Sequence, residues 1–276
     1  MKDAVILFVR AMLARAYPRV IGLVREPTWV VQETVLPVLS AAAYAFVYRG
    51  MGAPHFVALV FIGMAMTAFW LNVLWAMGAQ FYWERDSGNL ELFVMAPAPM
   101  SAVLAGMALG GMAMTASRAV VILLSGVLLF GVAFQPTSWA GLVGVVVLTL
   151  LALYGLGMCF ASAFLLWGRQ AWHVVNLFQE PVYLFSGLNY PVRTLGYAVA
   201  FVAGLIPMTF GMDALRQLLF PAPRFPPAMV DPLMPWPWEL GVLAAQVVLF
   251  IALARWLLGA LERRARQAGT LSLKGQ

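Results

Sequence analysis

The stretch Trp139–Leu166 reads WAGLVGVVVLTLLALYGLGMCFASAFLL and contains no acidic or basic residue. An α-helix rises 1.5 Å per residue, so about 20 apolar residues cross a hydrocarbon core of about 30 Å. In lipid the backbone must satisfy its own hydrogen bonds, which favours a helix for such a stretch. The stretch therefore predicts a membrane-spanning helix, and the fold depends on how many others accompany it.

The whole chain has the composition of a membrane protein. Of its 276 residues, 63% are hydrophobic and only 10% are charged, whereas a soluble domain carries about a quarter charged residues. The net charge of +6 comes mainly from basic residues that flank apolar stretches. Such residues determine membrane topology and contact lipid headgroups, so we expect no nucleic-acid partner. The sequence predicts an all-α polytopic membrane protein.

Outward from Trp139–Leu166, the hydropathy pattern predicts six transmembrane helices in a single domain, residues 1–276. The predicted spans are 29–48, 55–79, 102–131, 139–166, 171–187 and 238–259. Residues 188–220 hold a shorter apolar stretch bracketed by prolines, which favours a re-entrant helical segment over a seventh span. The landmarks of this segment are Gly187, Pro191 and Pro207.

Residues 1–28 mix apolar side chains with arginines. Arg15 and Arg19 are four residues apart and share one helical face. This pattern predicts an amphipathic helix on the membrane surface, with these arginines toward the headgroups. Pro18 is expected to interrupt the helix, and Glu26-Pro27 to mark its end.

The orientation follows from the basic residues between the predicted spans. Lys and Arg are concentrated on the side that holds both termini. The positive-inside rule therefore places both termini in the cytoplasm.

The predicted cytoplasmic loop at 82–100 is the most informative segment. Its charged and turn-forming residues precede an amphipathic stretch that ends at Pro97 and Pro99. The pattern fits a short surface helix that offers its charges to the cytosol, where a soluble partner can push it. An ordinary polar loop is the alternative that composition alone allows. The candidate contact residues are Glu84, Arg85, Asp86, Gly88, Leu90 and Glu91.

This loop resembles the Glu-Arg…Gly-Thr-Leu-Glu…Pro signature of type-two ABC exporter permeases, with Asn89 in place of the usual Thr. Three further segments are similar to that family in order and spacing. They are Leu23–Pro27, Ser186–Pro191 and Ile206–Arg216, the last with Ile206 in place of Asn. The resemblance covers residues from about 15 to 260.

The resemblance implies a permease that dimerises with a second copy or a paralogue and couples to separate ABC ATPase subunits through the loop at 82–100. The chain has no Gly-x-x-x-x-Gly-Lys-Ser/Thr phosphate loop. ATP and Mg²⁺ are therefore expected on the partner, with no cofactor in this chain. In the contact set, the charges would orient the ATPase, Leu90 would fill a pocket and Gly88 would allow close approach. The family implies export, and an apolar interior favours a hydrophobic or amphipathic cargo. The compact form indicates a prokaryotic inner membrane.

Polar residues within the predicted spans are candidates for the translocation path, because ionisable groups are costly in lipid. The alternative is hydrogen bonding between helices that sets their packing. Arg118 and Glu180 could form a pair. The candidates are Asn72, Arg118, Asn176, Gln179, Glu180 and Tyr183, of which the last four recur at helical spacing.

Two other classes of membrane protein are alternatives to the ABC permease. An ion-gradient-driven secondary transporter usually shows mid-membrane acidic groups in a repeated architecture, and this chain offers only Glu180. A membrane enzyme would need a metal cluster or a nucleophile with a base, and the sequence suggests neither, so no catalysis and no metal site are expected. Dependence on a separate ATPase distinguishes the ABC permease from both.

Overall fold

We describe the protein from a computed structural model, which covers residues 2–25, 27–78, 83–84, 86–167, 171–221, 225 and 231–268. These residues form helices and connections without a β-strand, so the predicted all-α membrane fold is confirmed. The long helices are α1 (Lys2–Arg25), α2 (Pro27–Gly50), α3 (Val57–Leu71), α6 (Met100–Phe130), α7 (Trp139–Trp167), α8 (Ala171–Phe185), α10 (Pro207–Leu219) and α12 (Trp236–Ala268). The short elements are η1 (Pro54–Phe56), η2 (Asn72–Gly78), α5 (Leu90–Met95), η4 (Val192–Leu195) and α9 (Tyr197–Ala203).

Five helical stretches of the described chain are long and apolar enough to cross a membrane. A sixth is added if α9 and α10, which are bent by 115°, count as one span. The five coincide with predicted spans, whose membrane boundaries stay predictions. They are Val31–Gly50, Pro54–Trp75, Met100–Phe130, Trp139–Ser162 and Trp236–Ala260.

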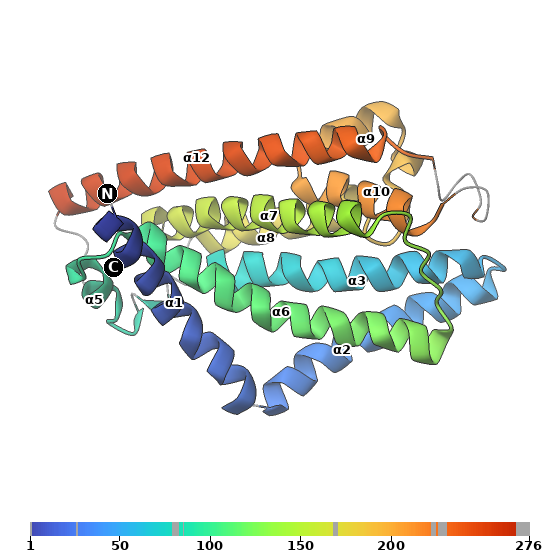
Figure 1. The fold of residues 1–276 in the computed structure, drawn as a ribbon, viewed down its shortest axis with the longest axis horizontal. Helices are drawn as coiled ribbons and strands as arrows, with labels where there is room; N and C mark the ends of the chain where they lie inside the picture. The colour runs from blue at the N-terminus through green and yellow to red at the C-terminus, as the bar shows by residue number, and fades with distance from the viewer. Residues whose placement is uncertain are drawn as a thin grey trace.

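The predicted span at 171–187 is shorter in the structure. Its helix, α8, has 15 residues and contains Pro181, so it extends about 22 Å, less than the hydrocarbon thickness of about 30 Å. It lies beside α7 (Figure 1). The sharp bend between α9 and α10 is compatible with the predicted re-entrant segment, which stays a prediction.

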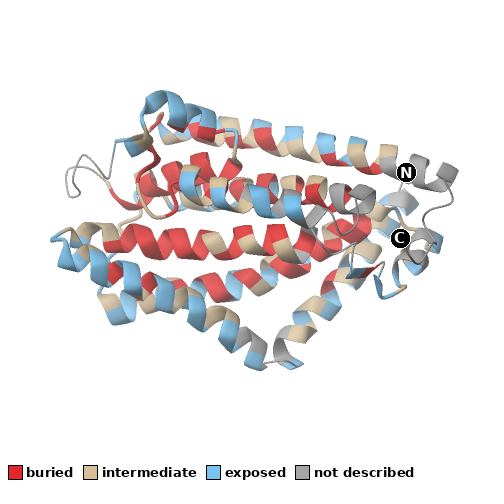
Figure 2. Cartoon of the chain, turned by 180° about the vertical axis from the view of Figure 1, so that it is seen from behind, coloured by how far each residue is buried: buried red, intermediate tan, exposed pale blue. Residues whose placement is uncertain are grey.

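The core of the domain is built around α3. Its side chains are buried along almost the whole helix, and Phe61 and Trp70 are fully enclosed (Figure 2). By contrast, α2 carries exposed large apolar residues along its length, including Leu39 and Phe46. Lipid can cover such a surface, so close packing on α3 rather than exclusion of water holds the helices together.

Gly63 on α3 tests this packing. A Cβ atom at Gly63 would collide with the backbone carbonyl group of Leu188. We expect Gly63→Ala to lower the free energy of unfolding by about 1–3 kcal/mol, because a backbone group cannot swing aside. Gly241→Ala on α12, where nothing lies within 4 Å, is the matched control and is expected to be neutral or stabilising. Unfolding in a detergent titration measures both, and equal behaviour of the two variants would contradict the prediction.

The N-terminal helix corrects two expectations. α1 continues through Pro18 to Arg25, so the predicted interruption is wrong. It runs obliquely across the bundle (Figure 1) and packs on α6. A Cβ at Gly110 of α6 would lie 2.9 Å from the carbonyl oxygen of Ala16, and a Cβ at Gly106 would lie still closer to the carbonyl oxygen of Met12. This close packing offsets the hydrogen bond that a proline removes from a helix interior.

The arginines of α1 also point opposite to the prediction. Arg15 and Arg19 lie on the face that meets α6, and the Arg19 guanidinium donates to the carbonyl oxygen of Met107 at 3.3 Å. The outward face carries exposed apolar side chains such as Val9 and Leu13. Burial lowers the pKa of Arg19 to about 10, which leaves it charged at neutral pH. The predicted orientation toward the headgroups is wrong. Both arginines contact residues distant in sequence: Arg15 pairs with Glu84, and Arg19 bonds to Met107.

Candidate functional site

The loop before α6 lies at one end of the bundle. Figure 1 shows α5 at the same end of the bundle as the start of α1 and the end of α12, whereas α9 and α10 lie at the opposite end. The distribution of basic residues predicts this clustering of the loop with both ends of the chain. Which end faces the cytoplasm stays a prediction.

Glu84 anchors this loop to α1. Its side chain is only 8% exposed and forms an ion pair with Arg15. The same carboxylate accepts from Asn89 Nδ2 at 3.2 Å, and the Asn89 amide donates to the Glu84 carbonyl oxygen at 2.8 Å. The structure therefore contradicts the expectation that Glu84 offers its charge to the cytosol. A loop carboxylate this far from water needs a cation, and α1 supplies it.

Arg15 joins three elements at this point. Its guanidinium lies over the ring of Phe93 on α5, 5.0 Å from the ring centroid, while its Cβ packs against Gly106 of α6. Burial lowers the pKa of Arg15, but the ion pair with Glu84 stabilises its charged form. We call this group of Arg15, Glu84, Asn89 and Phe93 the loop clamp. It ties the loop, α1 and α6 into one mechanical unit.

The remaining predicted contact residues occupy the outer part of the loop. Asp86 is exposed, and Gly88 adopts φ 77°, a conformation that favours glycine, in the turn before α5. Leu90 and Glu91 begin α5, and their side chains lie outside the described part of the structure. Arg85 lies outside the described residues altogether.

Asn72 is buried at the point where the α-helix of the second span becomes a π-helix. It begins η2, a π-helix that continues α3, and such segments occur often at functional positions. Its side-chain oxygen accepts from the hydroxyl of Tyr154 on α7 at 3.0 Å. The structure thus places Asn72 in helix packing, the alternative to a lining role.

This hydrogen bond is testable by substitution. Tyr154→Phe leaves the Asn72 oxygen without its donor, so we expect a loss of about 1–3 kcal/mol in the free energy of unfolding. Adding Asn72→Leu is expected to cost less than the sum of the single changes. Tyr17→Phe, at a side chain that is 66% exposed, is the control and is expected to be silent. Additive losses in a detergent unfolding series would show that the two residues are not coupled.

Arg118 has a different partner from the one predicted. It is buried on α6 and forms an ion pair with Glu33 of α2, so the pairing with Glu180 is wrong. Glu33 lies near the α1-proximal end of α2, and α2 packs on α6. Sequence spacing does not indicate this partner, because Glu33 lies in the short polar stretch near the start of α2, far from Arg118 in the sequence.

The α8 candidates divide between two faces. Asn176 and Glu180 are exposed, one helical turn apart. Gln179 accepts from the indole N–H of Trp75 at 3.2 Å, and Tyr183 packs against the core. The predicted stripe is therefore one packing face and one open polar face.

The residues of the predicted re-entrant segment shape its turns. Gly187 adopts φ 66°, and a Cβ there would lie 3.1 Å from the Tyr190 carbonyl oxygen. Pro191 precedes η4, and Pro207 is the first residue of α10. A proline is tolerated there, because the N–H that it lacks would have no partner within the helix.

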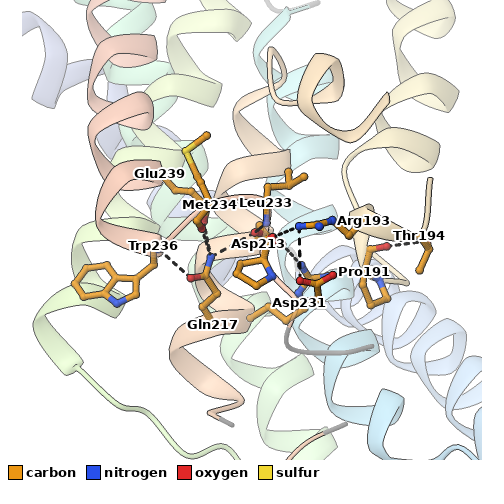
Figure 3. Close-up of polar contacts among 12 residues, drawn as sticks. Pro191, Arg193, Thr194, Asp213, Gln217, Asp231, Leu233, Met234, Trp236 and Glu239 are labelled. Atoms are coloured by element: carbon orange, nitrogen blue, oxygen red, sulfur yellow. Dashed lines mark hydrogen bonds and ion pairs between the residues drawn. The ribbon is translucent and has the colours of Figure 1, made fainter. Parts of the chain in front are cut away.

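A buried polar network joins α10 to the start of α12 (Figure 3). Asp213 forms an ion pair with Arg216 and accepts from the Leu233 amide at 2.8 Å. Gln217 donates to Glu239 at 3.0 Å and accepts from the Trp236 amide at 2.9 Å. The sequence indicated Asp213 and Arg216 only as part of the segment Ile206–Arg216, and it did not indicate Gln217 or Glu239. Helical spacing was the available signal for Gln217, which lies four residues after Asp213 on α10. Glu239 is on α12 and had no such local signal.

The polar residues that the structure describes include no candidate metal centre. In the part of the chain that the structure describes, no group of three or more His, Cys, Asp or Glu could hold a metal ion. What the arrangement offers is mechanical: one clamp between loop and helices at one end, and one rigid network at the other.

Comparison with known proteins gives the family. Residues 9–220 match the family model of the ABC-2 type transporter. No curated protein matches the chain. The matched range contains the loop clamp, α2 to α8 and the Asp213–Arg216 pair, so it includes the segments that carry the resemblance seen in the sequence. The chain therefore belongs to the ABC-2 type transporter family and is a membrane-embedded permease of the ABC transporter class.

Proposed function

We propose that this chain is the permease half of an ATP-driven exporter. Two copies, or one copy and a paralogue, associate with two ATPase subunits that bind ATP and Mg²⁺. The dimer moves a hydrophobic or amphipathic compound out across a prokaryotic plasma membrane, with both termini in the cytoplasm. Family membership supports the transporter class, and the apolar helices support the location in a membrane.

The loop clamp is the observation that carries the coupling step. A push on the loop reaches α1 through the Arg15–Glu84 pair and reaches α6 through the glycine contact at Gly106. A buried, charged pair resists separation, because each partner would be left uncompensated. ATPase closure would therefore move the loop, α1 and α6 together and change the access of the path.

The outer face of the loop has the character of a protein contact. Trp83, Leu92 and Met95 are exposed by 51%, 61% and 73%, close in sequence to the exposed Asp86. An apolar cluster outside the membrane, rimmed by charge, is typical of an interaction surface. We propose that this cluster and Asp86, with Arg85, Gly88, Leu90 and Glu91, meet the ATPase, while Glu84 holds the loop in shape.

The open face of α8 supports a position on the path. Asn176 and Glu180 are exposed on a helix of the membrane domain, where contact with lipid would be costly. We propose that a second permease subunit faces them, so that they line a polar route between the two halves. Arg118 and Asn72 then support this route by packing rather than by contact with cargo.

Native mass spectrometry of the complex tests the proposal. The chain would be expressed with its genetic neighbours, purified in mild detergent through its own tag, and weighed intact. We expect two ~30 kDa permease chains with two ATPase subunits. A chain that runs without an ATPase, in the presence and absence of nucleotide, would contradict the proposal. It would favour the ion-gradient-driven carrier, for which Glu180 is the available acidic group.

A further inference from the structure

The π-helix η2 lies between the buried core and the loop clamp. It follows α3 without a break and ends at Gly78, six residues (84 − 78) before Glu84. A π-helix bonds each N–H to the carbonyl group five residues back, so a turn of η2 holds one residue more than an α-helical turn. A return of that turn to α geometry would rotate the residues after it by about 100° and shift them by about 1.5 Å. A displacement of the loop clamp along the chain toward α3 therefore passes first through a segment whose winding has an α-helical alternative.

The side of η2 that faces α7 is tightly packed. A Cβ at Gly157 of α7 would lie 2.8 Å from Val73 Cγ1 and 3.0 Å from Met77 Sδ. Both of these η2 side chains are fully buried. Asn72 accepts the hydrogen bond of Tyr154 on the same helix. This side of η2 therefore has little room to move.

The other side of η2 carries Trp75, which reaches α8. Its indole N–H donates to Gln179 Oε1 at 3.2 Å, and both side chains are half-buried. Gln179 directly precedes Glu180, which is exposed on α8 one helical turn after Asn176. The hydrogen bond therefore joins η2 to the turn of α8 that carries the open polar face.

The backbone of α8 is weakened next to this turn. Pro181 lies inside the helix and has no N–H to bond to the carbonyl group of Leu177, four residues earlier. A helix kinks most readily where a proline interrupts its backbone hydrogen bonds. Two helices with irregular backbone hydrogen bonding thus meet at a single side-chain hydrogen bond.

We propose that η2 is the hinge of the coupling step and that Trp75 is the positioning residue that orients the polar face of α8 through Gln179. Movement of the loop clamp changes the winding of η2 and turns Trp75 relative to Gln179. The turn of α8 that carries Asn176 and Glu180 then rotates. The role in transport rests on the proposed function, in which this face lines the path, whereas the mechanical link is a property of the chain alone.

Distances between two spin labels in the isolated chain test the positioning role. The labels are attached at Asn176→Cys and, on α7, at Val143→Cys, where the native side chain is 61% exposed. A Cys159→Ala background removes the single native cysteine. Labelled chain is diluted with unlabelled chain in phosphatidylcholine nanodiscs, so that pulsed EPR records distances within one chain. We expect Trp75→Phe to raise the population of a second distance about twofold to tenfold, which corresponds to the loss of one hydrogen bond.

Further variants separate the hydrogen bond from the aromatic ring. Gln179→Met removes the acceptor and is expected to match Trp75→Phe, with no further change in the double variant. Gln179→Glu keeps an acceptor oxygen and is expected to keep the wild-type distance. Trp236→Phe is the matched control, because Trp236 is also half-buried against the core, and it is expected to have no effect. A wild-type distance in Trp75→Phe, or an equal change in Trp236→Phe, would overturn the positioning role.

Release of the loop clamp tests the hinge without an ATPase. Arg15→Glu breaks the pair with Glu84 and is expected to shift the same distance, because the freed loop lets η2 change its winding. Glu84→Gln weakens the pair without a charge clash and is expected to give a smaller shift in the same direction. Arg10→Glu, on the exposed side of α1, is expected to leave the distance unchanged. Unchanged distances in both clamp variants, or a further shift when Arg15→Glu is added to Trp75→Phe, would show that the loop does not act through Trp75.

Failure of the exporter proposal is distinguishable from failure of the hinge. Should no ATPase associate with the chain, the distances in the isolated chain still decide whether η2 links the loop clamp to α8. In the reconstituted complex, ATP and Mg²⁺ are expected to shift the distance in the wild-type chain but not in Trp75→Phe. A shift in both chains, or in neither, would overturn the role of η2 in coupling.

Discussion

Charge reversal at the loop clamp is expected to uncouple the permease. Arg15→Glu places two carboxylates together, and Glu84→Arg places two guanidinium groups together, at a site where Glu84 is 8% exposed and Arg15 23% exposed. Breaking a fully buried pair costs about 3–5 kcal/mol, and the partial exposure of Arg15 reduces this. We expect the affinity of the ATPase for the permease to fall about tenfold to a hundredfold, because the loop loses its position. The exchange Arg15→Glu with Glu84→Arg is expected to restore most of the binding.

The measurement is titration of the purified ATPase onto nanodiscs that hold each variant. Arg10→Glu is the matched control, since Arg10 lies on the exposed side of α1 and undergoes the same charge change. The clamp would be refuted if Arg10→Glu weakened binding as much as Arg15→Glu, or if the exchange gave no recovery. The Arg15→Glu chain must still elute as a monodisperse membrane protein, which separates a displaced loop from global unfolding.

Arg216→Met is expected to give the largest loss of stability in the molecule. Arg216 is 3% exposed, pairs with Asp213, and lies near Glu239, which is fully buried. Removing the cation leaves the buried Asp213 carboxylate without its ion-pair partner, so we expect a loss of about 3–5 kcal/mol in the free energy of unfolding. Adding Asp213→Asn keeps the acceptor for Leu233 and removes one charge, and is expected to recover more than about 1 kcal/mol.

Arg193→Met is the control at the same end of the domain. Arg193 pairs with Asp231 at 3.6 Å, with 35% and 55% of the two side chains exposed. Water screens such a pair, so its loss is expected to cost less than about 1 kcal/mol. Detergent unfolding measures the series. Equal losses for Arg193→Met and Arg216→Met, or further loss on adding Asp213→Asn, would show that burial of the network does not govern its energy.

Hydropathy was sufficient to predict the five helical stretches that are long and apolar enough to cross a membrane. A stretch such as Trp139–Leu166 has one viable structure in lipid, because its backbone must bond to itself. Hydropathy was a weaker guide to α8, which is short and contains Pro181 and several polar residues. It also did not predict that α1 continues through Pro18. Packing decides such cases, and packing partners are not adjacent in sequence.

The polar contacts were harder to predict for the same reason. Arg15 meets Glu84 across 69 positions of sequence, and Arg118 meets Glu33 rather than the acidic residue that shares the later spans. Spacing identifies the residues on one helix face but not the helix that faces them. The loop was found through its family signature, whereas the network of Gln217 and Glu239 needed the packing of α10 on α12, which no local pattern indicates.

The inward arginines of α1 impose an order on biosynthesis. Arg19 contacts Met107, 88 positions later, and a ribosome that adds about 5–20 residues per second needs about 4–18 s to cover that distance. Arg15 can meet Glu84 once residue 84 is made, but until α6 is made the Met107 acceptor of Arg19 does not exist, and water and lipid phosphates can take its place. We therefore expect the nascent helix to rest on the membrane surface first, and to turn the face that carries Arg19 inward once Gly106 and Gly110 of α6 are available for packing.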